Sequence, residues 1–168
     1  MSLGFFWAKG PQVLMTCQID QSGKIEQTNR DTVIALSNDI QVAIILPRKT
    51  KRIIKKIFRE QGKSKIFIYL TFSALIFLLL KLFPPKKKVI IDKEYPGYEE
   101  FIKLNIINNF QKMKITQLPV LEFGLVGKSS RAHDYANKIA KKIKKANKIV
   151  KLEEVLKLIL VKKRSRAT

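Results

Sequence analysis

The feature that most constrains the fold is a run of fifteen residues without a charge, IFIYLTFSALIFLLL at positions 66–80. A helix that crosses a bilayer needs about 20 consecutive apolar residues, and here Lys81 and then Pro84-Pro85 follow too early. Lysines flank the run on both sides, so the positive charges favour no orientation across a membrane. We therefore expect the run to be buried inside a folded domain. A small membrane-anchored basic protein held by 66–83 is the less favoured alternative.

The composition within the run predicts two elements. Its β-branched and aromatic beginning is typical of a buried strand, which we expect at 66–71, and its leucine-rich end predicts a buried helix at 72–83. The segments before the run include short apolar and β-branched stretches of the kind that form strands. Strands are expected at 13–20, 32–37 and 41–46, with a further extended stretch at 24–28.

Turn and helix signals connect these strands. Asn38-Asp39 separates the strands expected at 32–37 and 41–46 and predicts a hairpin turn between them. At 48–61 apolar residues recur at helical spacing opposite a basic face, and Gly62 marks the end of that helix. After the uncharged run, strands are expected at 88–92 and 119–126. Helices are expected at 96–111, from an N-cap at Ser130 to about 147, and at 152–162.

Early strands joined by hairpins, followed by strands that alternate with helices, predict an α/β fold with a mixed sheet covered by helices. We expect one domain at 1–150 and a C-terminal basic helix and tail at 151–168. A single cysteine, Cys17, and a single histidine, His133, exclude a disulfide framework and a Cys/His metal cluster. The apolar first ten residues lack a signal-peptide pattern, so we expect a cytoplasmic protein.

The charge predicts a polyanionic partner. Lys and Arg number 34 against 13 Asp and Glu, a net charge of +21, while 46% of the residues are hydrophobic, so a packed core carries a cationic surface. DNA, RNA or an anionic membrane face fits such a surface, and no small-molecule cofactor is expected. A merely solvated lysine-rich surface is the alternative. The candidate nucleic-acid-binding residues lie on two predicted helices: Lys51, Lys55, Lys56, Arg59, Lys138, Lys141, Lys142 and Lys145.

Acidic residues are scarce, and three of them stand where elements end or begin. Asp20 ends the first predicted strand, Asp92 ends a later strand, and Asp134 lies in the first turn of a helix. If these carboxylates converge, Mg²⁺ or Mn²⁺ would hold them together and activate water against a phosphodiester. Each aspartate also has an ordinary interpretation, as a turn residue or a partner of a helix dipole. His133 is considered as a proton shuttle beside the site or as a structural residue.

The order strand, aspartate and turn, with further aspartates after a later strand and at a helix start, resembles the ribonuclease-H-like superfamily. Ile19-Asp20-Gln21-Ser22-Gly23 is similar to the Asp-Glu-Ser-Gly opening of a poorly characterised prokaryotic branch, with Gln21 in place of Glu. The resemblance covers roughly 13–147. It implies a ribonuclease-H-like mixed sheet and a metal-dependent nuclease, with Asp20, Asp92 and Asp134 as catalytic metal ligands. Glu94 or Glu60 is expected as a fourth catalytic acid. A non-catalytic nucleic-acid-binding protein of the same fold is the alternative.

Overall fold

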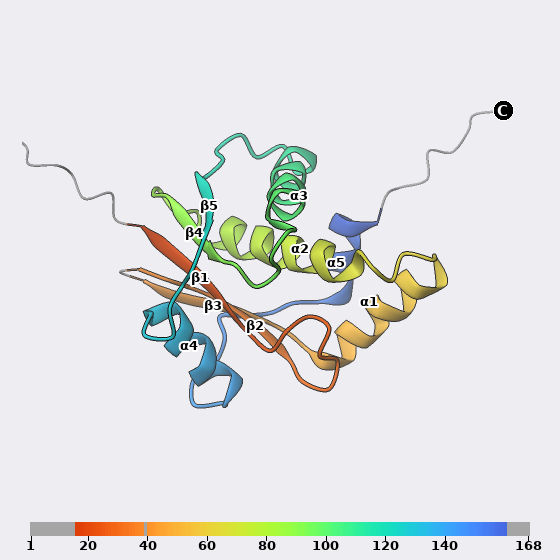
Figure 1. The fold of residues 1–168 in the computed structure, drawn as a ribbon, viewed down its shortest axis with the longest axis horizontal. Helices are drawn as coiled ribbons and strands as arrows, with labels where there is room; N and C mark the ends of the chain where they lie inside the picture. Colours follow the sequence, from red (N-terminus) through yellow and green to blue (C-terminus); the bar gives the residue numbers. More distant parts are fainter. Residues whose placement is uncertain (1–15, 39, 161–168) are drawn as a thin grey trace, which may run out of the picture.

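The structure is a computed structural model and describes residues 16–38 and 40–160. Within these residues six strands form one sheet, and five helices cover it (Figure 1). The elements in chain order are β1 (Cys17–Ser22), β2 (Thr32–Ser37), β3 (Gln41–Leu46), α1 (Arg48–Glu60), α2 (Phe67–Leu82), β4 (Val89–Asp92), α3 (Glu99–Lys112), β5 (Leu121–Gly124), α4 (Arg131–Ala140), β6 (Lys148–Ile149) and α5 (Leu152–Ile159).

The sheet is mixed, in the order β5-β4-β1-β2-β3-β6. The first three strands are antiparallel neighbours, as expected for segments joined by short turns, and β4 is parallel to β1 while β5 is parallel to β4. The short β6 adds to β3 in parallel. The α/β class and the mixed sheet predicted from the sequence are thereby confirmed. Because β4 lies directly beside β1, the carboxyl ends of both strands meet at one edge of the sheet.

The two faces of the sheet carry different cores. On one face, α1, α2, α3 and α5 enclose the main hydrophobic cluster, to which Ile34 and Leu36 of β2 contribute. The alternate residues Val33 and Ala35 point to the other face, where α4 covers a smaller cluster. This alternation follows from the two-residue period of a strand. Because of the same alternation, the side chains at even positions of β1, such as Asp20, lie on the face of the sheet that α4 covers.

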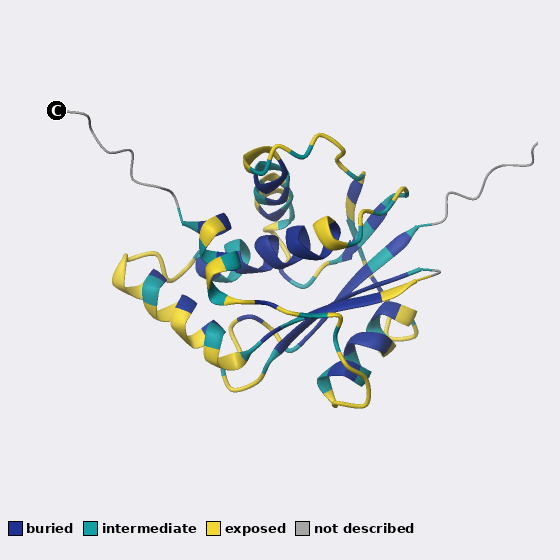
Figure 2. Ribbon diagram, turned by 180° about the vertical axis from the view of Figure 1, so that it is seen from behind, coloured by how far each residue is buried: buried dark blue, intermediate teal, exposed yellow. Residues whose placement is uncertain are grey.

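The prediction of a strand at 66–71 was wrong, because α2 is one continuous helix from Phe67 to Leu82. Figure 2 shows this helix buried almost throughout its length, between the sheet and its neighbouring helices. A helix buried on every side has no polar face, so its sequence lacks the helical period that would have identified it. One of its few polar residues, Ser73, is satisfied within the helix and donates to the Tyr69 carbonyl at 2.7 Å. Among the described residues, no helix combines the length and the apolar character that crossing a bilayer requires.

Three further boundaries differ from the sequence-based expectations. Residues 24–28 form turns in place of an extended stretch. The helix expected from 96 begins at Glu99, after a turn in which Gly97 has a φ of +88°. The helix expected to reach about 147 ends at Ala140, since Lys142 adopts a left-handed φ of +59° that a helix cannot contain. The predicted strand at 13–20 is observed as β1 from Cys17, and its first three residues lie outside the described part.

The C-terminal helix α5 packs into the main core through Val155, Leu158 and Ile159. Within the described residues it therefore shares one core with the rest of the domain. The basic tail beyond residue 160, and the apolar first ten residues, lie outside the described part of the chain.

Candidate metal centre

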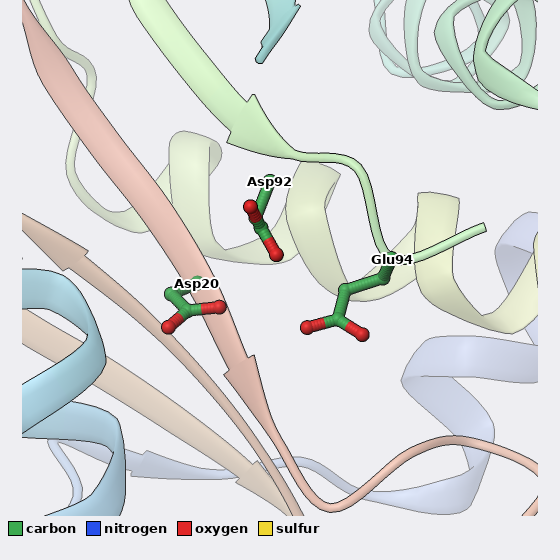
Figure 3. Close-up of side chains that lie close together, drawn as sticks. All are labelled: Asp20, Asp92 and Glu94. Carbon is green, nitrogen blue, oxygen red and sulfur yellow. The ribbon is translucent and has the colours of Figure 1, made fainter. Parts of the chain in front are cut away.

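Three carboxylates meet at the edge of the sheet where β1 and β4 end. Ile19 of β1 pairs with Ile91 of β4, so the next residues along, Asp20 and Asp92, lie side by side on neighbouring parallel strands. Glu94 follows on the chain segment that leaves β4 and turns its side chain back toward them (Figure 3). One carboxylate oxygen from each of the three lies within 4.8 Å of the others. This spacing lets one cation contact all three residues.

Backbone amides fix two of the carboxylates. The amide of Gln21 donates to Asp20 Oδ1 at 2.8 Å, and the amide of Val126, just after β5, donates to Asp92 Oδ1 at 2.7 Å. Hydrogen bonds to an ionised acceptor are among the stronger ones in proteins. Both carboxylates are therefore held in place before any ligand arrives.

The electrostatics of the cluster are unfavourable without a cation. Burial raises the pKa of Asp20, and the charge of Asp92 adds to this, while the Gln21 amide and His133 act in the opposite direction. The pKa of Glu94 is raised to about 7, first by burial and then by Asp92 and Asp20, with Lys24 opposing. Carboxylates that repel one another in a half-buried site are stabilised as anions by a hard divalent cation, which prefers oxygen ligands. The donor set therefore fits a metal ion.

Two of the predicted acids lie elsewhere. Asp134 is exposed, with its carboxylate 2.7 Å from Lys138 Nζ on the same helix. Glu60 is exposed at the end of α1, 3.9 Å from Lys56 Nζ. The structure thus brings together Asp20, Asp92 and Glu94 of the predicted acids. Neither Asp134 nor Glu60 joins them.

His133 occupies the place at Asp20 that was expected for Asp134. Its Nδ1 lies 2.7 Å from Asp20 Oδ2, and Asn137 Nδ2 lies 2.9 Å from His133 Nε2. Neighbouring residues of a helix point about 100° apart, so only one of two consecutive side chains can face the strand. The Ser130 hydroxyl caps α4 by accepting from the His133 amide at 3.0 Å, as the turn sequence predicted, and this places His133 in the first turn.

The prediction that Lys51 contacts nucleic acid was wrong. Its side chain is fully buried, and its ammonium donates to the carbonyls of Lys24 and Gln27 and to the hydroxyl of Thr32, at 3.0, 2.7 and 2.8 Å. Burial lowers its pKa to about 8. Lys51 therefore fastens the β1–β2 loop to α1, and it occupies the buried side of a helix whose other basic residues face water.

The remaining predicted cations are exposed or half-buried, but they do not form one patch. Lys55, Lys56 and Arg59 lie on the outer side of α1, while Lys141, Lys142 and Lys145 follow the end of α4. These two helices cover opposite faces of the sheet (Figure 1). Lys138 is paired with Asp134.

Two exposed lysines that the sequence reasoning missed adjoin the acids, one in the chain and one through its charge. Lys93 separates Asp92 from Glu94 in the chain, and Lys24 lies near enough to Glu94 to lower its pKa. The sequence could have identified both lysines, because each lies just after the end of a strand that carries one of the acids.

Comparisons of the chain with protein-family models, with curated proteins and with solved structures each found no match.

Proposed function

We propose that this chain is a divalent-metal-dependent nuclease that cleaves phosphodiester bonds of nucleic acid. The observation that carries the proposal is the convergence of Asp20, Asp92 and Glu94 at the ends of adjacent parallel strands. A cationic surface of net charge +21 supports a polyanionic substrate.

The residues have distinct roles in this proposal. Asp20, Asp92 and Glu94 hold Mg²⁺ or Mn²⁺, which when bound activates water and neutralises charge on a phosphate. Lys24 and Lys93 are exposed beside the acids and contact phosphate oxygens. Lysines farther away guide the nucleic acid without reading its sequence.

The proposed fold relationship is to the ribonuclease-H-like superfamily. Three antiparallel strands followed by strands parallel to β1 support it, as do the acids on β1 and β4. A departure lies on α4, where His133 and not Asp134 meets Asp20.

One observation favours a second candidate, a nucleic-acid-binding protein of this fold without catalysis. In the described part of the chain the cluster contains three acids, and neither of the expected additional acids reaches it. Such a protein would bind nucleic acid and leave every phosphodiester intact.

Cleavage assays on single-stranded, duplex, hybrid and branched substrates with Mg²⁺ or Mn²⁺ separate the two candidates. Asp20→Asn keeps the shape of the side chain and removes its charge, so we expect it to lower the cleavage rate by about three orders of magnitude, since metal-assisted steps supply several kcal/mol. Asp134→Asn is the matched control on an exposed aspartate and is expected to cleave at the wild-type rate. Binding without cleavage of any substrate by the wild type would favour the second candidate.

A further inference from the structure

A strand and a helix meet in register beside the candidate metal centre. Asp20 and Ser22 are two residues apart on β1 and lie on the face covered by α4. Two residues of a strand span roughly 6.6 Å. His133 and Asn137 are four residues apart on α4, and four residues of a helix rise about 6 Å. The spacings match, so each strand residue meets one helix residue.

Hydrogen bonds join the four side chains in a chain. The Ser22 hydroxyl donates to Asn137 Oδ1 at 3.2 Å, and the amide nitrogen of Asn137 faces His133. That nitrogen carries only donor hydrogens, and it lies 2.9 Å from His133 Nε2. Nε2 therefore accepts, and the ring proton resides on Nδ1. From there it is donated to Asp20 Oδ2 across 2.7 Å.

We propose that His133 is a positioning residue for Asp20, held by Asn137 and Ser22 so that its Nδ1 donates to the carboxylate. The Gln21 amide binds one oxygen of Asp20 and His133 binds the other, so the carboxylate cannot rotate. Each oxygen of Asp20 keeps a further lone pair that a cation can contact. The inference rests on the proposed metal centre, whose ligands are Asp20, Asp92 and Glu94.

The first test reads the imidazole directly. His133 is the only histidine in the chain, so the ¹⁵N spectrum of histidine-labelled, metal-free protein contains one imidazole. We expect a protonated Nδ1 and an unprotonated Nε2 in the wild type. Asn137→Ala removes the donor to Nε2, and we expect a larger share of the rings to carry a proton on Nε2 in this variant.

The second test measures Mn²⁺ affinity from the electron paramagnetic resonance signal of free Mn²⁺, without any substrate. Residues that hold a metal ligand typically change affinity 10- to 100-fold when altered, and we expect a loss in this range for His133→Ala and a smaller loss for Asn137→Ala. His133→Asn retains an N–H close to the position of Nδ1 and should recover most of the affinity. Asp134→Asn, one residue along the same helix, is the control and should bind as the wild type does.

The outcomes are distinguishable once thermal unfolding shows that the variants are folded. A doubly protonated ring, or a proton on Nε2 in the wild type, would overturn the inference while leaving the metal centre standing. Unchanged Mn²⁺ affinity in His133→Ala would do the same. Absence of Mn²⁺ binding in the wild type would instead remove the proposed centre, and the positioning role of His133 with it, whatever the tautomer.

Discussion

At the scale of single residues, the pKa of Glu94 shows that the three carboxylates repel one another. Its pKa of about 7 lies well above the ordinary value of 4.5, through burial first and then through the charges of Asp92 and Asp20. Without a cation, part of the population therefore carries a proton on Glu94 at neutral pH. Binding of a metal requires that this proton leave.

The raised pKa predicts how stability depends on pH in EDTA. The folded state binds the proton of Glu94 more tightly than the unfolded chain does, so this stabilisation is complete below pH 4.5 and is lost as the pH rises through 7. We expect the free energy of unfolding to fall by about 2 kcal/mol between pH 5 and 8 on account of this group. Denaturant titrations at several pH values measure it.

Glu94→Gln should be less sensitive to pH over that interval, because the amide does not titrate. Glu100→Gln, an exposed change on α3, is the matched control and should behave as the wild type. Identical pH profiles for the wild type and Glu94→Gln would show that Glu94 does not titrate differently in the folded and unfolded states.

Lys51 provides a second prediction at this scale. Lys51→Met keeps the apolar stem but leaves two loop carbonyls and the buried Thr32 hydroxyl without the lysine donor, so we expect it to destabilise the fold by about 3 kcal/mol. Lys55→Met, an exposed change on the same helix, should change stability by less than about 0.5 kcal/mol. Urea unfolding of both variants checks this. Equal stabilities would contradict the role of Lys51 in fastening the loop.

At the scale of elements, the sequence predicted those with a distinct composition or period. The β-branched runs of β2 and β3 identified two strands, and the helical spacing in α1 identified a helix with a buried and an exposed side. The helix α2 was divided wrongly because burial on every side removes the pattern, leaving only residue preferences, which favoured a strand for its aromatic beginning. The two-residue β6 was missed because so short an element leaves no pattern.

The same reasoning found part of the site. Asp20 and Asp92 were predictable because both stand at strand ends, and parallel neighbours place these ends together. The choice between His133 and Asp134 depends on how α4 is rotated about its axis, which the sequence does not show. Glu94 was expected as a substitute for a missing acid, and the turn after β4 brings it into the cluster.

Two glycines with a positive φ, Gly23 in the β1–β2 loop and Gly62 after α1, differ in the space around them. Gly23 has a φ of +76°, and a Cβ there would lie 2.2 Å from the carbonyl oxygen of Asp31. Gly62 has a similar φ of +70° with nothing within 4 Å of a Cβ. We expect Gly62→Ala to destabilise the fold by about 1 kcal/mol through backbone strain alone, and Gly23→Ala by at least about 3 kcal/mol, because the loop must also shift.

Thermal unfolding of the two glycine variants measures this difference. Because Gly23 follows Ser22 and the end of β1, Gly23→Ala should also weaken Mn²⁺ binding, whereas Gly62→Ala should not. Equal effects of the two substitutions on stability would contradict the close approach of Gly23 to Asp31.

At the scale of the whole molecule, a net charge of +21 accompanies three acids that meet where β1 and β4 end. Salt should weaken the binding of nucleic acid. We expect log Kd to rise linearly with the logarithm of the salt concentration, with a slope of roughly 0.9 for each phosphate contacted in duplex DNA. The α4 face carries Asp20 and His133. We therefore expect neutralisation of Lys141, Lys142 and Lys145 to weaken binding and reduce the slope more than neutralisation of Lys55, Lys56 and Arg59.

Fluorescence anisotropy with a labelled oligonucleotide at several salt concentrations compares the two triple variants, which are matched in charge removed. A larger effect of the α1 triple would place the path of the nucleic acid on the opposite face. An affinity that does not change with salt would contradict a polyanionic partner.

The most direct measurement is an anomalous difference map from crystals of the full chain soaked in Mn²⁺. The account predicts one strong peak between Asp20, Asp92 and Glu94, with a carboxylate oxygen of each at a metal–ligand distance of roughly 2 Å. The same soak of Asp20→Asn crystals should show a weaker peak or none. A map with no peak among these three carboxylates in the wild type, or with its peak at Asp134 or Glu60, would contradict the account.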